Sequence, residues 1–275
     1  MKVTEYPKVS SFDANDILLK DGPNGTKTIM IPDAAKEFVE AAMPADMHRN
    51  IYRGKNLGTS ITATQKNAIK NGTFADLYVG DYWTLGGKRY VIADMDYWYN
   101  CGDTAFVKHH LVMVPDSCLY SHVMNDTNTT VGGYVGSKMY TEGLNQAKTT
   151  IQAAFGDLLL SHREYLTNAV TNGYPSAGAW FDSDVELMNE VMVYGSYIYT
   201  PGGTGSVTPS RYTINKQQLA LFKLNPKAIN KRETIWLRDV VSSAGFAYVS
   251  NLGSANYAYA SNSGGVRPVF PIGVN

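Results

Sequence analysis

The feature that most constrains this fold is a two-residue turn, Gly86-Gly87, between two strand-like runs. The segment GDYWTLGGKRYVIADMD is rich in aromatic and β-branched residues on both sides of the glycines. A Gly-Gly pair in this setting favours a tight turn between antiparallel strands. The hairpin places Trp83 opposite Tyr90 on one face. The chain therefore contains an antiparallel sheet.

Three further segments predict regular structure. Thr62 and Gln65 fit a capping box that begins a short helix ending at Asn71-Gly72. The segment HHLVMVPD predicts a strand. An amphipathic helix is predicted where apolar residues recur at helical spacing, namely Leu144, Ala147, Ile151, Ala154 and Phe155.

A third helix is predicted from a capping box at Ser183 and Glu186. It continues through Leu187, Val191 and Met192. Together these segments predict an α+β fold in which strands and long loops dominate.

We predict that residues 1 to 45 form a small separate module and that residues 46 to 275 form one continuous domain. Ile17 to Leu19 and Ile29 to Ile31 flank the turn DGPNG, and Asp33 caps a helix over Ala34 to Ala42. The GPNGTKT stretch has only two residues between its glycines, so it predicts a turn rather than a phosphate-binding loop. A module this small requires a partner or an oligomer for stability.

Composition narrows the function classes. The 275 residues include 24 basic and 24 acidic side chains and no basic run, so nucleic acid is not expected as a partner. No run reaches the roughly 18 apolar residues of a membrane span, and the N-terminus lacks an apolar signal core. Membrane insertion is therefore not expected. Cys101 and Cys118 are expected as buried free thiols, with a single disulfide as the alternative.

Two histidine-containing segments are candidates for catalysis or metal binding. His109 and His110 point to opposite faces if they lie in a strand, so they cannot share one metal ion without help from another element. His162 and Glu164 share a face and predict a polar contact, since no nucleophile motif accompanies them.

Asp94, Asp96 and Asp103 lie among aromatic residues and raise calcium as an alternative. Their spacing lacks the ligand order of an EF-hand loop. We therefore predict no catalytic residue, no metal and no cofactor.

The C-terminal tail contains an uncharged run, Phe246 to Gly265, between strand-like WLRDV and GVRPVFPIG. Charged residues are 17% of the whole chain, against roughly 25% in average domains. Tyr offers a large amphipathic contact area, and Ser, Gly and Asn offer adaptable hydrogen bonds, as in antibody paratopes. The run therefore favours a binding surface. The alternative is glycine-kinked strands with inward-stacked tyrosines.

The order of VGDYWTLGGKRYVIADMD, HHLVMVP, the amphipathic helix, WLRD and GVRPVFPIG resembles the C-type-lectin-like domains of phage and gut-bacterial structural proteins. That group is similar in architecture to formylglycine-generating enzymes and to the tropism determinant of a Bordetella phage. The resemblance covers about residues 50 to 273. Formylglycine-generating enzymes depend on a cysteine pair in their C-terminal half, and here both cysteines precede residue 120. The resemblance therefore implies a binding protein rather than an enzyme.

The segment NDILLKDGPNGTKTI resembles an N-terminal segment of phage head-fibre and tail-associated proteins, where it fixes the protein to the particle. This resemblance implies a protein of the virion surface, attached to other virion proteins through residues 1 to 45. A homotrimer is expected by analogy with fibres and the tropism determinant.

In the related tropism proteins, a retroelement rewrites a C-terminal variable repeat, and adenine-rich codons there yield residues such as Asn, Tyr, Ser, Ala and Gly. The resemblance implies that such positions contact a bacterial cell-surface protein or glycan. The candidate contact positions are Ser242, Ser243, Gly245, Tyr248, Ser250, Asn251, Asn256, Tyr257, Tyr259 and Asn262.

The sequence also allows two other functions. In a purely structural capsid-decoration or fibre protein, the tail packs against neighbouring subunits. In a surface hydrolase, His162 or His109 acts as the base.

Overall fold

The computed structural model describes residues 17–20, 27–30, 39, 43–200 and 217–275. The chain divides into two compact units, Met1–Pro44 and Ala45–Asn275. In unit 1, strands β1 (Ile17–Lys20) and β2 (Lys27–Met30) pair antiparallel. This pairing confirms the two predicted strands. The helix predicted over Ala34 to Ala42 lies outside the described residues, except for Val39.

Unit 2 is mixed α+β, with mostly sheet and few helices. Its first sheet has the strand order β3-β4-β5-β14-β9, its second sheet has the order β12-β11-β10-β13-β6, and β7 and β8 form a separate hairpin. The strands are β3 (Tyr82–Leu85), β4 (Lys88–Met95), β5 (Leu111–Pro115), β6 (Tyr120–Val123), β7 (His162–Thr171), β8 (Tyr174–Ser183), β9 (Glu186–Leu187), β10 (Ile235–Val240), β11 (Gly245–Val249), β12 (Ala255–Tyr259), β13 (Ser263–Val266) and β14 (Pro268–Ile272).

The β3–β4 hairpin confirms the tight turn. Gly86 and Gly87 have φ values of 54° and 74°, which suit a two-residue turn of this kind. Trp83 lies opposite Tyr90, and both side chains are fully buried. The hairpin therefore contributes two aromatic rings to the core at the start of the first sheet.

Helices cover little of the chain. The α-helices of unit 2 are α2 (Ala63–Lys70), α3 (Asn145–Phe155), α4 (Glu190–Tyr194) and α5 (Ala220–Leu224). The 3-10 helices are η2 (Ala45–Asn50), η4 (Gly156–Leu158) and η6 (Pro226–Ala228), and η3 (Met139–Gly143) is a π-helix. Among the described residues, no helix is long and apolar enough to cross a membrane.

Two of the three predicted helices of this unit are confirmed. Thr62 and Gln65 form the expected capping box at the start of α2, which ends before Asn71. Helix α3 buries Ala147, Ile151 and Phe155 on one face, as the apolar spacing predicted.

The predicted helix from Ser183 to Met192 is wrong at its start. Ser183 ends β8, and its hydroxyl donates to the Glu186 carboxylate at 2.8 Å. The Ser183 hydroxyl thus contacts a side chain, and Glu186 pairs with Val269 in the first sheet. Helix α4 begins only at Glu190, where the Asn189 side chain accepts the Met192 backbone N–H at 2.7 Å.

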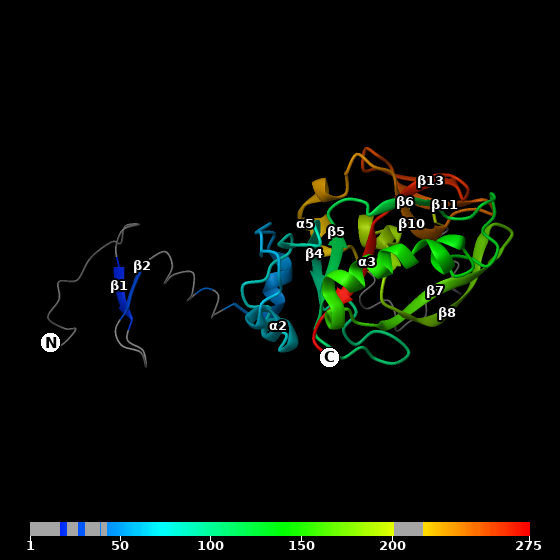
Figure 1. Cartoon of the computed structure of the whole chain (residues 1–275). Coiled ribbons are helices and arrows are strands. Elements are labelled where there is room, and N and C mark those ends of the chain that lie inside the picture. Colours follow the sequence, from blue (N-terminus) through cyan, green and yellow to red (C-terminus); the bar gives the residue numbers. More distant parts are fainter. Residues whose placement is uncertain (1–16, 21–26, 31–38, 40–42, 201–216) are drawn as a thin grey trace, which may run out of the picture. The chain divides into compact units, whose positions relative to one another are not determined.

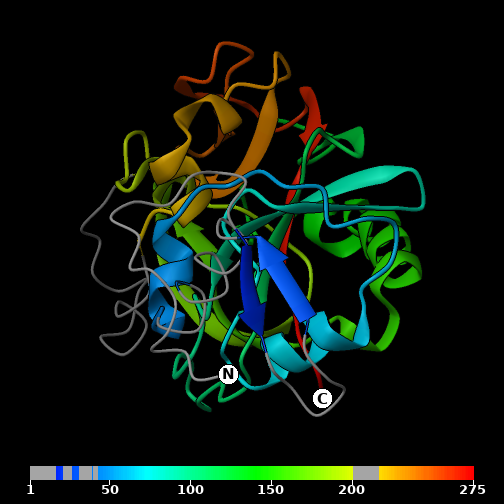
Figure 2. The same cartoon turned by 90° about the vertical axis from the view of Figure 1, so that its left-hand side faces the viewer.

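The C-terminal strands join the two sheets. Strand β13 belongs to the second sheet and β14 to the first, with Arg267 alone between them. In both views the β10–β12 segment lies at one end of unit 2 and α2 at the other, and β14 extends from the first end towards the second (Figures 1 and 2). The C-terminal tail therefore contributes strands to both sheets of unit 2.

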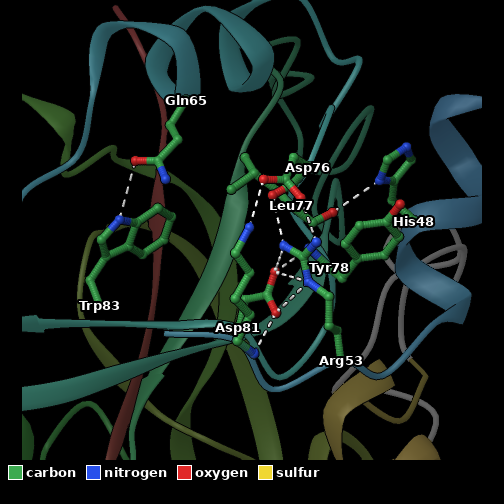
Figure 3. A network of polar contacts seen from close by, with 9 residues as sticks. His48, Arg53, Gln65, Asp76, Leu77, Tyr78, Asp81 and Trp83 are labelled. Atoms are coloured by element: carbon green, nitrogen blue, oxygen red, sulfur yellow. Dashed lines mark hydrogen bonds and ion pairs between the residues drawn. The ribbon is translucent and has the colours of Figure 1, made fainter. Parts of the chain in front are cut away.

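A network around Arg53 ties the first residues of unit 2 to the chain beside β3 (Figure 3). The Arg53 guanidinium donates to Asp81 at 2.6 Å and to Asp76 at 2.5 Å, and it lies 4.4 Å from the centre of the Tyr78 ring. Asp81 is fully buried and also accepts the Lys55 backbone N–H at 2.8 Å. The buried carboxylate is therefore paired and hydrogen-bonded, which a buried charge requires.

Candidate ligand-contact surface

The uncharged run of the tail forms the β11–β12 hairpin. Gly245 lies opposite Tyr259, and Ala247 opposite Tyr257. Strand β12 ends the second sheet within the described part of the chain. Both uncharged strands therefore lie at one margin of a sheet.

The candidate tyrosines face two different sides of this sheet. Residues opposite each other in an antiparallel pair share a face, and neighbours along a strand alternate. Tyr257 and Tyr259 therefore lie on the face of Ala247. Tyr248 lies on the other face, where its ring packs edge-on against Trp236 at 6.0 Å between centroids.

Exposure separates the two groups further. Tyr257 is 49% exposed and Tyr259 is 59% exposed. Tyr248 is half-buried and packs against the main hydrophobic cluster. The structure thus places Tyr257 and Tyr259 at the surface and gives Tyr248 a mainly structural position.

The other candidate positions divide in the same way. Exposed positions are Ser243, Asn251 and Asn262, and half-buried positions are Ser242, Ser250 and Asn256. Gly245 is buried, and a Cβ atom there would lie 2.5 Å from the Ala258 carbonyl oxygen. Gly245 is therefore removed from the set of positions whose side chains can reach a ligand.

The candidates also occupy both ends of the hairpin. Ser242, Ser243 and Asn262 lie in the turns next to the Gly245–Tyr259 pair. Ser250 and Asn251 lie in the turn at the other end, about four residues along the strands, or roughly 14 Å away. The sequence run is therefore not one continuous contact patch.

Two residues outside the tail complete the exposed face. The Tyr199 ring lies 5.3 Å from the Tyr257 ring between centroids. Ile198 is 51% exposed and Tyr199 is 40% exposed. We define the edge surface as Ile198, Tyr199, Tyr257 and Tyr259. The segment YGSYIYT has the same Tyr, Ser and Gly composition as the tail, and this signal could have identified it from sequence.

Glu190 holds the Tyr199 segment in place. Its side chain is fully buried at the start of α4. The carboxylate accepts the backbone N–H groups of Ile198, Tyr199 and Thr200 at 3.1, 3.0 and 2.9 Å. Hydrogen bonds to a carboxylate are stronger than those between neutral groups. These hydrogen bonds therefore fix the backbone of half of the edge surface.

Asn256 satisfies part of the outer edge of β12. Its side-chain oxygen accepts the Tyr257 backbone N–H at 2.8 Å. Unpaired N–H groups on an edge strand invite pairing with another chain. This local bond removes one donor that an added strand would use, so it favours recognition through side chains.

His162 and Glu164 form the predicted polar contact deep in unit 2. His162 Nε2 lies 3.1 Å from Glu164 Oε2, and Arg238 donates to the other oxygen of the same carboxylate. Burial by itself raises the pKa of Glu164, but the Arg238 guanidinium and His162 hold that pKa below its usual value. This arrangement is that of a buried ion pair with a histidine partner.

The other histidine pair contacts one carboxylate. His109 Nδ1 lies 2.7 Å from Asp96, and the His110 backbone N–H donates to Asp96 at 2.9 Å. Burial lowers the pKa of His110 to about 3, so this imidazole is neutral at physiological pH. The His109 ring stacks on Tyr99 at 4.9 Å. These contacts fix a loop.

The three candidate calcium ligands bind separate partners. Asp94 pairs with Arg49 at 2.9 Å, Asp96 contacts His109, and Asp103 pairs with Arg163 at 2.7 Å. Within the described ranges, no three His, Cys, Asp or Glu side chains gather as a metal site requires. Cys101 and Cys118 form no disulfide bond with each other, and Cys101 is buried whereas Cys118 is half-buried.

Comparisons with protein-family models, with curated proteins and with solved structures found no match for this chain.

Proposed function

We propose that unit 2 is a ligand-binding domain of a phage or prophage virion surface protein, which contacts a bacterial cell-surface protein or glycan through the edge surface. The observation that carries this proposal is the pair of exposed rings, Tyr257 and Tyr259. They lie on β12, the strand at the margin of the second sheet, and the Tyr257 ring lies beside that of Tyr199. Exposed aromatic side chains on a fixed backbone are the residues that dominate binding energies in protein contacts.

The virion setting and the C-type-lectin-like assignment rest on the sequence resemblance. The mixed α+β architecture is the coarse feature of the fold that supports this part of the proposal. Attachment through residues 1 to 45 and a homotrimeric assembly belong to the same proposal. A monomeric mass at micromolar concentration would remove the trimer from it.

The proposal predicts that the purified intact protein binds cells of a host bacterium. The double variant Tyr257→Ser, Tyr259→Ser is expected to lose this binding, because both anchors of the edge surface are removed. Tyr174→Ser is a matched control, since Tyr174 is 52% exposed on β8, outside the edge surface. Equal binding by all three proteins, measured by cell sedimentation, would overturn the assignment of the surface.

The alternative is a structural decoration or fibre protein that uses the same edge between subunits. The exposed margin of β12 is the observation that favours it, because edge strands also pair with copies of themselves. Under this alternative the double variant lowers the oligomer mass and the melting temperature together. Under the binding proposal both remain unchanged.

A further inference from the structure

A polar cavity of about 280 Å³ lies in unit 2, away from the edge surface, with which it shares no residue. Its lining comes from β3, β4, α5 and η6, together with the segment around Tyr52. The charged residues among its lining are Arg89, Asp116, Lys227, Lys231 and Arg267. Within the lining, four cations against one carboxylate leave an excess of three positive charges, of which the Glu233 carboxylate outside the lining offsets part near Arg267.

Asp116 does not balance this excess. Its carboxylate lies 2.6 Å from Lys231 and 3.6 Å from Arg89. Burial by itself raises the pKa of Asp116, but its cationic neighbours hold that pKa below the usual value, so the group is charged. It neutralises one cation, while Lys227 has no ion-pair partner among the described residues.

Arg267 is the buried cation of the cavity. Its Nε donates to the Pro115 carbonyl at 2.8 Å, and its Nη1 donates to the Ala228 carbonyl at 3.0 Å. Its Nη2 is buried and has no hydrogen-bond acceptor in the described part of the chain. The Asp116 and Glu233 carboxylates act on this charge, but neither accepts a hydrogen bond from Nη2. A buried donor without a partner is costly. An anion held by the cations of the lining would add a countercharge beside this buried guanidinium.

One wall of the cavity contains aromatic rings, and one of these rings packs against a position that only glycine can occupy. The Tyr52 ring lies so close to Gly80 that a Cβ atom there would be 2.2 Å from the ring. Gly80 also has a φ of +86°, which disfavours other residues. On the same lining, the Arg89 guanidinium lies 4.2 Å from the centre of the Tyr82 ring. The Tyr52 and Tyr82 side chains thus contribute two aromatic rings to the lining.

The wall is held in place by the Arg53 network of Figure 3. Asp81, which pairs with Arg53, stands between the lining residues Gly80 and Tyr82. The Arg53 backbone N–H donates to the Val79 carbonyl at 2.9 Å. The two segments that form the wall are therefore fixed to each other, so the cavity is formed without a ligand.

We propose that this cavity binds a tetrahedral oxyanion, a phosphate or sulfate group carried by a sugar-sized molecule. Cations on separate elements surround one space, as an oxyanion with several acceptor oxygens requires. The volume lies near the roughly 300 Å³ at the lower end of small-molecule sites and exceeds what a bare ion requires.

Isothermal titration of the intact chain tests the site with inorganic phosphate, glucose 6-phosphate, glucose 6-sulfate and glucuronate. At least one of the two sugar esters is expected to bind more tightly than inorganic phosphate, and glucuronate more weakly than that ester. The comparison of phosphate with sulfate ester identifies the group. Lys227→Gln is expected to weaken ester binding about tenfold, as for loss of a charge-assisted contact.

The matched control is Lys148→Gln, which removes the same charge from a lysine paired with Asp184 outside the cavity. Unchanged binding by this control supports a local site. Arg89→Gln gives a second cavity variant that leaves the buried Arg267 intact. The proposal is overturned if neither ester binds, if both lysine variants weaken binding equally, or if glucuronate binds as tightly as the esters.

Discussion

Strands β12 and β14 both come from the tail, yet they have opposite environments. All five residues of β14 are buried between β5 and β9. None of the five residues of β12 is fully buried, and the strand has a described neighbour on one side only. Position in a sheet therefore decides whether a tail residue supports the core or lies at the surface.

This difference accounts for the composition of the two strands. Strand β14 reads PVFPI and fills space on both faces, whereas β12 reads ANYAY and leaves two rings exposed. Side chains of β12 can change with little loss of packing. A contact surface built there is separated energetically from the frame that carries it.

The largest effect is expected at Phe270 in β14. This side chain is fully buried, and its ring lies 5.2 Å from Phe155 and 6.0 Å from Tyr90. Phe270→Ala is expected to lower the free energy of unfolding by about 3–5 kcal/mol, through lost burial and a cavity. Urea unfolding measures this loss, and Phe270→Leu should lose less. A loss below about 1 kcal/mol would contradict the central position of β14.

Tyr248 sharpens the comparison within the hairpin itself. It lies one strand from Tyr257, but it packs on Trp236. Tyr248→Ser is expected to cost about 2 kcal/mol of unfolding free energy, and Tyr248→Phe much less, because the ring makes the contact. Thermal unfolding of both variants checks this. A neutral Tyr248→Ser would place Tyr248 with the contact residues.

Glu186 lies in β9, next to β14, and its buried carboxyl group should make the stability of the protein depend on pH. Burial raises the pKa of Glu186 to about 7, against about 4.3 in an unfolded chain. Between these values the folded state binds more protons, so wild-type stability falls as pH rises, by up to about 1.4 kcal/mol per pH unit from this group.

Glu186→Gln has no proton to lose at this position. The stability of the wild type relative to Glu186→Gln should therefore decline from about pH 4.5 to about pH 7 and then level off. Chemical unfolding across this range measures the difference. A constant difference would mean that Glu186 ionises in the folded protein as it does in water.

The smallest effect on stability is expected at the edge surface. Tyr257→Ser retains the strand and removes a ring that is 49% exposed. The change should alter the free energy of unfolding by no more than about 0.5 kcal/mol, as for ordinary surface substitutions. A loss near that of Tyr248→Ser would erase the distinction between the two faces.

Local signals predicted much of the frame. The Gly86-Gly87 turn and the Thr62–Gln65 capping box depend on residues close in sequence, and both were confirmed. The helix predicted from the Ser183–Glu186 pattern was wrong at its start. Glu186 lies in strand β9, which pairs with β14, and the Ser183 hydroxyl donates to the Glu186 carboxylate instead of capping a helix. A local pattern could not show that a distant strand, β14, competes for Glu186.

The site was predicted only in part, for a physical reason. The composition of the tail placed Tyr257, Tyr259 and Tyr248 together among the candidates, and only the pairing of β11 with β12 separates the two exposed rings from Tyr248. The contribution of Tyr199 depends on the buried Glu190 carboxylate and on a ring contact across the fold. Such contacts between distant residues leave no periodic signal in the sequence.

The most direct test is tyrosine nitration of the intact protein, read by mass spectrometry, free in solution and bound to host cells. We expect Tyr257 and Tyr259 to react in the free protein and to be protected on cells, while Tyr174 reacts in both states. Equal reaction of Tyr257 and Tyr259 in both states, or no reaction in the free protein, would contradict a contact surface at β12.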